Sequence, residues 1–230
     1  MGALEEAYLS LEEPPRSDHL WRYTPWRRVH PTGDPNEIPS GISTPEISLT
    51  MLDGQEISGI TIETENEISA PFDGSPTSIS FLRAITNGKA IHVRIPDNWR
   101  SKVPMILDIK PTGGLEAAHI HIEAGKFSEA TLLTRVQGGF EWLGLLRTGV
   151  TGDGSHLSDV LVNKSQGGPL VRVDALRLGR DSSLTAGTVS AGNASTKADI
   201  RYLLDSPGAN LSVLGSLLST GEMQLDHHIE

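Results

Sequence analysis

Short runs of alternating apolar and polar residues dominate the chain from about residue 46 onward, and they limit the folds open to it. The clearest runs are ISGITI, SISFLRAI, IHVRI, MILDI and AHIHIEA, and turn-forming residues such as Gly, Pro, Asp and Asn lie between them. Because successive side chains of a strand point to opposite faces, this alternation predicts short β-strands. We find no convincing amphipathic helix between residues 46 and 230, so this part is predicted to be mainly β.

Three segments in the later half share a glycine-containing turn, a polar residue and then a strand: AGKFSEATLL (124–133), LGRDSSLTAG (178–187) and SPGANLSVLG (206–215). Their glycines are Gly125, Gly179 and Gly208, so one interval is nearly twice the other. A repeat of about 25–30 residues with two or three short strands is typical of a β-solenoid. Glycine at its corners would allow positive φ. We therefore predict a right-handed parallel β-helix over residues 46–230.

A β-sandwich or jelly roll is the competing all-β fold, and it would need hairpins. The strongest hairpin signal is Asn87-Gly88, which lies between two apolar runs in FLRAITNGKAIHVRI. No comparable two-residue turn joins matched strands beyond residue 150, which favours the parallel β-helix.

Residues 1–45 are predicted to form a separate helical and irregular segment. Residues 3–13 can form a short helix that ends at Pro14-Pro15. The following stretch, SDHLWRYTPWRRVHPTGDPNEIPSG, is rich in Trp, Arg and Pro and is predicted to have irregular structure. Ser17 or Asp18 could cap one helical turn within it.

Charge and cysteine content exclude several classes of function. With 19 basic and 29 acidic residues the net charge is -10, which argues against nucleic-acid binding and against an anionic membrane surface. The chain has no cysteine, so it holds no disulfide and no cysteine-ligated cluster of its own. It has neither a long apolar run nor the basic-then-apolar order of a secretory signal, and we expect a cytoplasmic protein.

Two sets of side chains have the spacing of metal ligands. In AHIHIEAG, the alternation places His119, His121 and Glu123 on one face of a strand, as in a cupin-type site. Near the C-terminus, Asp226, His228 and Glu230 have the same spacing. The simpler interpretation of both is the solvated outer face of a strand, and we expect no metal site. His92 and Arg94 in IHVRIP are likewise expected on the surface.

Catalytic patterns are weak. Glu63 and Glu65 lie on one face of TIETENE and could flank a glycosidic bond, as carboxylates do on the exposed sheets of β-helix enzymes. The glycine-rich stretches TGVTGDGSH and SQGGP lack the Lys-Ser/Thr and the helix of a phosphate-binding loop. The sequence also has no G-x-S-x-G motif. We therefore expect no enzyme, with a carbohydrate-active β-helix enzyme and a cupin-like metal protein as the alternatives.

Two segments at opposite ends of the chain resemble the SufB/SufD family. PPRSDHLWRYTPW (14–26) looks like the N-terminal signature of the SufD branch, and DIRYLLDSPGANLSVLGSLLSTGEMQLDHHIE (199–230) is similar to the family's core strands. IHVRIPDNW (91–99) resembles the strand that opens the solenoid. The residues that carry the likeness are Arg16, Trp21, Arg22, Tyr23, Thr24, Gly208, Ala209, Gly221, Gln224, Asp226 and His228.

The resemblance implies a right-handed parallel β-helix that serves as a non-catalytic scaffold in iron–sulfur cluster assembly. Its partners would be a SufB-like subunit and the ATPase SufC. The cluster thiolates would come from SufB, and the use of a flavin in the full complex is left open. The family's C-terminal helical region, which holds SufC, is absent here, so the chain is expected to be C-terminally truncated.

With that region absent, HHIE is expected to be an interior coil left exposed. A homodimer through residues 211–230 is the further expectation, since an exposed coil offers unpaired backbone groups. The candidate edge residues are Gln224, Asp226, His228 and Glu230.

Overall fold

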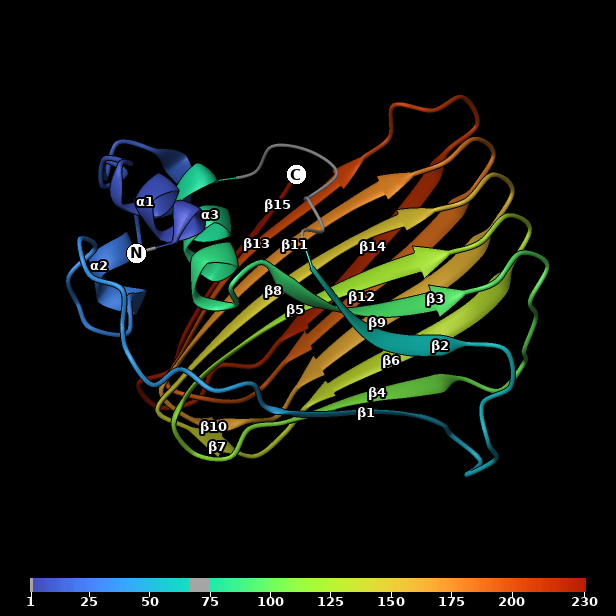
Figure 1. Ribbon diagram of the computed structural model, residues 1–230, viewed down its shortest axis with the longest axis horizontal. Coiled ribbons are helices and arrows are strands. Elements are labelled where there is room, and N and C mark those ends of the chain that lie inside the picture. The colour runs from blue at the N-terminus through green and yellow to red at the C-terminus, as the bar shows by residue number, and fades with distance from the viewer. Residues whose placement is uncertain (1, 67–74) are drawn as a thin grey trace.

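The computed structural model describes residues 2–66 and 75–230. With 49% of residues in strands and 11% in helices, the chain is mainly β, and it forms a parallel β-solenoid of about five coils (Figure 1). This confirms the predicted parallel β-helix. The elements in chain order are α1 (Ala3–Leu9), η1 (His19–Trp21), α2 (Trp26–Val29), β1 (Glu46–Met51), β2 (Thr61–Asn66), α3 (Pro76–Ile85), β3 (Lys89–Ile95), β4 (Met105–Lys110), β5 (Leu115–Ala124), β6 (Glu129–Val136), β7 (Gly139–Phe140), β8 (Trp142–Thr151), β9 (His156–Asn163), β10 (Gln166–Gly167), β11 (Pro169–Leu178), β12 (Ser183–Ser190), β13 (Ser195–Leu203), β14 (Asn210–Leu217) and β15 (Gln224–Ile229).

Two long sheets form the walls of the solenoid. Sheet A has the spatial order β2-β3-β5-β8-β11-β13-β15, and sheet B has the order β1-β4-β6-β9-β12-β14. The short strands β7 and β10 form a third, two-stranded parallel sheet. Each main sheet opens with one antiparallel strand, since β1 pairs with β4 and β2 with β3, and the pairs that follow are parallel. Sequence-distant parallel neighbours exclude the sandwich built from hairpins.

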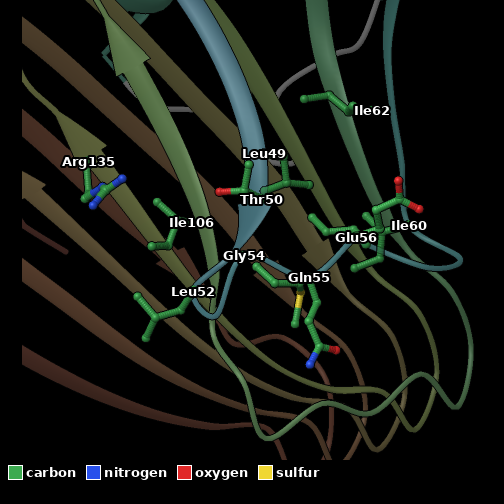
Figure 2. A pocket seen from close by; sticks show the side chains of 12 residues that line it. Leu49, Thr50, Leu52, Gly54, Gln55, Glu56, Ile60, Ile62, Ile106 and Arg135 are labelled. Atoms are coloured by element: carbon green, nitrogen blue, oxygen red, sulfur yellow. The ribbon is translucent and has the colours of Figure 1, made fainter.

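A hollow of about 740 Å³ lies beside the antiparallel strands that open the solenoid (Figure 2). Leu49 of β1 and Ile62 of β2 line it together with the connection between the two strands. Arg135 and Ile106 reach it from sheet B, and Glu56 is the carboxylate in its lining. Most of the lining is aliphatic, so the hollow is an incompletely covered apolar region at this end of the wall.

Most coils repeat at a step of 27 residues. Leu115 pairs with Trp142, and Leu143 pairs with Leu170 in the next coil. The same step separates the hydrogen-bonded side chains Arg147 and Asp174, at |i−j| of 27. Equivalent side chains therefore stack in columns across the sheets, and these columns are the unit from which the core is built.

Two of the three corner glycines, Gly125 and Gly179, are required by backbone contact and not, as predicted, by positive φ, whereas Gly208 has the predicted positive φ. Gly125 and Gly179 lie two coils apart, with Gly152 in the coil between them. A Cβ at Gly152 would lie 2.6 Å from the Lys126 nitrogen, and one at Gly179 would lie 2.4 Å from the Thr151 oxygen. Neither distance is sterically possible, so these positions are small because successive coils touch there.

Positive φ occurs in a different column of the same corner. Asn98, Phe127, Gly154, Asp181 and Gly208 have φ of 60°, 55°, 65°, 53° and 73°. A backbone N–H in each of the first four donates to the following coil, for example from Phe127 to Asp153 and from Asp181 to Pro207. Gly208 therefore belongs to this left-handed column, which explains why its spacing from Gly179 did not match the repeat.

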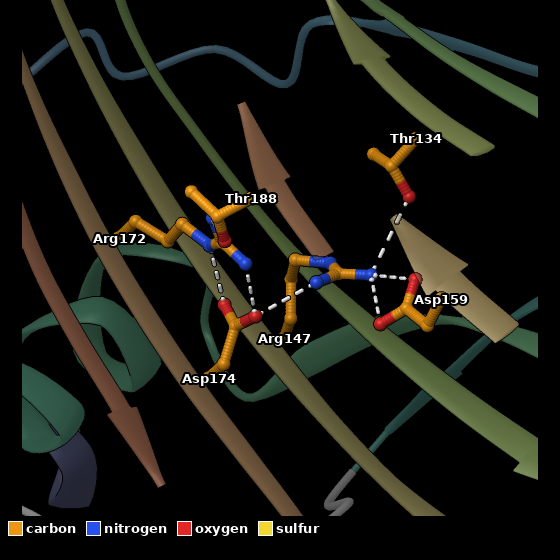
Figure 3. A network of polar contacts seen from close by, with 6 residues as sticks. All are labelled: Thr134, Arg147, Asp159, Arg172, Asp174 and Thr188. Carbon is orange, nitrogen blue, oxygen red and sulfur yellow. Dashed lines mark hydrogen bonds and ion pairs between the residues drawn. The ribbon is translucent and has the colours of Figure 1, made fainter. Parts of the chain in front are cut away.

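In the part of the chain that the structure describes, the interior of the solenoid is mostly aliphatic and contains a buried charge network (Figure 3). Arg147 donates to both carboxylate oxygens of Asp159, at 2.7 and 2.8 Å, and to Asp174 at 2.7 Å. Arg172 donates to both oxygens of Asp174, at 2.9 and 2.6 Å, and to Thr188 at 3.1 Å. The network contains two cations and two anions and joins sheet A to sheet B across the core.

One predicted strand is a helix. SISFLRAI lies within α3, where Pro76 occupies the first turn and Phe81 and Leu82 are fully buried. Apolar residues in this segment suit a helical face as well as a strand, and Pro at the first turn favours the helix. The expected absence of helices after residue 46 was therefore wrong. The hairpin signal at Asn87-Gly88 does not mark a two-residue hairpin, because these residues, both at positive φ, join the end of α3 to β3.

The helices cover part of the outer face of sheet A (Figure 1). Trp26 and Phe81 pack with Trp142 of β8, and Val171 and Val173 of β11 join the same apolar cluster. The first helix ends at Leu9, earlier than predicted, while Asp18 caps η1 through the Leu20 N–H, as predicted for one of two candidates. Among the described residues, none of the helices has the length and apolar character needed to cross a membrane.

Candidate functional site

The histidines singled out in the sequence lie together on the outer face of sheet A. The register places His92 beside His121, and His121 beside Thr148 of the next coil. The Thr148 hydroxyl is 2.8 Å from His119 Nε2 and 2.7 Å from His121 Nδ1. A hydroxyl has one proton, so Thr148 donates to one ring and accepts from the other.

His119 and His121 are buried, at 2% and 8% exposure, so the solvated outer face expected for them was wrong. The physical reason is that α3 packs against β5 and β8 on this side of the sheet. Burial lowers the pKa of His119 to about 3 and that of His121 to about 4. Both rings are therefore neutral in the folded protein at pH 7.

Glu123 belongs to an ion cluster with His92, Arg94 and Glu65. His92 Nδ1 lies 3.1 Å from Glu65, and His92 Nε2 lies 3.1 Å from Glu123. Arg94 bridges the same two carboxylates, at 2.8 Å from Glu65 and 3.3 Å from Glu123. The expected surface position of His92 was wrong, because its side chain is buried between β2 and β5, whereas Arg94 is 43% exposed.

The ion cluster does not suit Glu65 as the general acid of the glycosidase pair considered for Glu63 and Glu65. The hydrogen bond from His92 is the main cause that lowers the pKa of Glu65, and the charge of Arg94 acts in the same direction. A general acid needs the opposite shift, because it must carry a proton near neutral pH. Glu65 is thus held as a carboxylate. Glu63 lies on β2, as Glu65 does, and its register partner on β3 is His92.

No group of three or more His, Asp or Glu side chains in residues 2–66 and 75–230 could hold a metal ion. His119 and His121 contact Thr148, while Glu123 contacts His92 and Arg94, so the first candidate set is divided between two clusters. The second set is divided among three partners. Those contacts are Asp226 to Lys197 at 2.9 Å, His228 to Asp199 at 3.7 Å and Glu230 to Arg201 at 2.5 Å.

The segments that resemble the SufB/SufD family meet in space, although they lie at opposite ends of the chain. Gln224 donates a hydrogen bond to the Thr24 hydroxyl at 3.0 Å, across 200 residues of sequence. Lys197 lies 5.3 Å from the ring centroid of Trp21 and pairs with Asp226. Of the other signature residues, Arg16, Arg22 and Tyr23 are exposed, and Gly208, Ala209 and Gly221 lie in the turns next to β14 and β15.

The coil formed by β14 and β15 presents apolar side chains to solvent. Leu214 and Leu218 are 66% and 60% exposed, and Leu217 is 48% exposed. β15 is also the edge of sheet A, so one side of its backbone pairs with no strand of the described chain. An unpaired strand edge next to exposed leucines is a surface suited to protein–protein contact.

Sequence reasoning missed Lys197, Asp199 and Arg201, which hold three of the C-terminal side chains. The register pairs Lys197 with Asp226 and Asp199 with His228. These pairs are offset by 29 residues, two more than the 27-residue step of the middle coils, so the repeat alone would not have aligned them.

No protein-family model, curated protein or solved structure matches this chain. The likeness to the SufB/SufD family therefore depends on the quoted sequence segments alone.

Proposed function

We propose that this protein is a scaffold subunit of the SUF iron–sulfur cluster assembly machinery, working with a SufB-like subunit and a SufC-like ATPase. In this role it contributes shape and an interaction surface and performs no chemistry of its own. The iron–sulfur cluster is the cargo of the complex. Its thiolate ligands would come from the SufB-like partner, because this chain has no cysteine.

The observation that carries the proposal is the contact between the two family-like segments. A short sequence likeness can arise by chance, but two such segments far apart in sequence would then have no reason to meet. Here Thr24 and Gln224 share a hydrogen bond, and Trp21 and Asp226 share Lys197. The parallel β-solenoid is also the fold that the likeness implies.

The proposed partner surface is the coil of β14 and β15. The side chains of Gln224, Asp226, His228 and Glu230 all have partners within the chain. The contact would therefore use the open backbone edge of β15 and the exposed leucines of β14, and not these four side chains. A second copy of this chain is the other partner that such an edge could accept.

Co-purification tests the proposal directly. The full chain would be co-expressed with the SufB-like and SufC-like proteins of its own organism, and complexes measured by size-exclusion chromatography with light scattering. We expect a stable complex with the SufB-like subunit. Recovery of the chain free of both partners would overturn the proposal, and a concentration-dependent dimer alone would favour self-association.

A matched pair of variants locates the surface. Leu214 is 66% exposed in β14, and Leu52 is 56% exposed at the opposite end of the solenoid. Leu214→Asp should reduce recovery of the complex at least about tenfold, because it buries a charge in the contact. Leu52→Asp should leave recovery unchanged. Equal effects of the two variants would show that the contact lies elsewhere.

A further inference from the structure

Lys197 of β13 is a buried lysine, only 2% exposed, on the outer face of sheet A. Its ammonium group donates to the Leu20 carbonyl oxygen and to Asp226 at 2.9 Å, and it lies 5.3 Å from the Trp21 ring centroid. A lysine ammonium has three N–H donors, and a carbonyl, a carboxylate and an indole face are three acceptors for it. The charge is thus fully compensated within the fold.

The partners of Lys197 come from two parts of the chain that are far apart in sequence. Leu20 and Trp21 belong to the N-terminal segment, whereas Asp226 belongs to β15 at the edge of the sheet. Asp226 is the register partner of Lys197, so their side chains stand side by side on one face. One buried cation therefore links the N-terminal segment to the edge strand.

Two further contacts link the same regions. Gln224, the first residue of β15, donates to Thr24. The rings of His19 and His228 lie 5.4 Å apart, so the N-terminal segment contacts β15 at both of its ends. Within residues 2–66 and 75–230, β15 has a neighbouring strand on one side only, and these side-chain contacts supply support that interior strands receive from a second neighbour.

We infer that residues 18–24 are a clamp that holds β15 in the sheet, and that Lys197 is the positioning residue through which the clamp works. The inference rests on the proposed function in one respect: β15 matters because it forms the proposed partner surface. An ordered edge strand presents its backbone groups in register for a partner, whereas a frayed strand must first be ordered. The clamp therefore controls how strongly the edge binds.

Hydrogen–deuterium exchange of the free, full chain tests the clamp without any partner. Lys197→Met keeps the aliphatic stem and removes the charge. We expect the amides that bond β15 to β13 or its flanks, such as Gln224 to Ala194 and Glu230 to Ile200, to exchange at least about tenfold faster. Lys126→Met is the matched control, since Lys126 is exposed and its ion pair with Asp153 is loose, at 3.8 Å. Unchanged exchange of β15 in folded Lys197→Met would overturn the inference.

A milder variant keeps the test decisive if Lys197→Met does not fold. Gln224→Ala removes only the bond to Thr24, and we expect about threefold faster exchange in β15 with the other strands unaffected. No change in β15 for this variant would contradict the clamp.

A binding arm separates the two proposals. If the wild-type chain binds no SufB-like partner, the proposed function fails while the exchange result still stands. If it does bind, Gln224→Ala should weaken binding about as much as it increases fraying of β15. A variant that frays β15 and leaves binding unchanged would contradict the role of the clamp in partner binding.

Discussion

The middle coils of the solenoid and the coil of β14 and β15 follow the same pattern of alternating strands but differ in burial. Leu145 of β8 and Leu176 of β11 are at most 1% exposed, whereas Val213 and Leu217 of β14 are 38% and 48% exposed. The difference does not come from the side chains, which are equally apolar. In a solenoid each strand is buried by the coils on both sides, so the same residue types form a core in one place and a surface in another.

The largest expected difference between the two regions concerns the buried charge network of the middle coils. Asp174→Ala should lower the free energy of unfolding by about 3–5 kcal/mol, because it leaves Arg147 and Arg172 without their shared carboxylate in the core. Leu217→Ala in β14 should cost less than about 1 kcal/mol, because the side chain is already half exposed. Urea unfolding of the two variants measures both free energies. Similar losses would show that the middle coils and the coil of β14 and β15 do not differ in burial as described.

A pair of glycines makes the same comparison on the backbone. A Cβ at Gly149 of β8 would lie 2.5 Å from the Ile122 oxygen, whereas nothing lies within 4 Å of a Cβ at Gly215 of β14. Gly149→Ala should therefore cost about 1–3 kcal/mol through overpacking. Gly215→Ala should be neutral, or stabilising by up to about 1 kcal/mol, because it only restricts the unfolded chain. Thermal unfolding of both variants would show whether contact between successive coils determines the stability change that an added Cβ causes.

The smallest expected effect is a dependence of stability on pH that originates in the covered wall. Burial lowers the pKa of His119 to about 3, below the ordinary value of 6.5. Below pH 6.5 the unfolded chain binds a proton at His119 that the folded chain does not, and this favours unfolding. The stability that comes from keeping His119 neutral is therefore fully present above pH 6.5 and is lost as the pH falls toward 3. We expect His119 to account for about 1 kcal/mol of lost stability between pH 7 and 5.5.

The variant His119→Gln isolates this contribution. It should show a shallower loss of stability across that range than the wild type, whatever its stability at pH 7. Identical slopes for the two proteins in urea unfolding at pH 7, 6 and 5.5 would exclude His119 as a source of the pH dependence.

How much of this molecule could be predicted from the sequence depended on the range of the interactions. Alternation identified strands such as β3, β5 and β4, because the period of two is a local property. It misassigned α3, where Ile79, Phe81 and Ile85 fit a period of two while Phe81, Leu82 and Ile85 fit one face of a helix. The predicted repeat of about 25–30 residues includes the observed step of 27, but its exact value was concealed because Gly125 and Gly179 are two coils apart and Gly208 belongs to another column. The candidate site was predicted less well, since burial of His119 depends on a helix that the sequence reading had assigned as a strand.

The 27-residue step has an evolutionary consequence. A duplication or loss of one whole step adds or removes a layer while leaving every remaining side chain on its original side of the wall. An insertion of a single residue within a strand instead moves the side chains in the rest of that strand to the opposite face of the sheet. Proteins of this shape are therefore free to change length by entire layers, while changes of one or two residues should be confined to the connections.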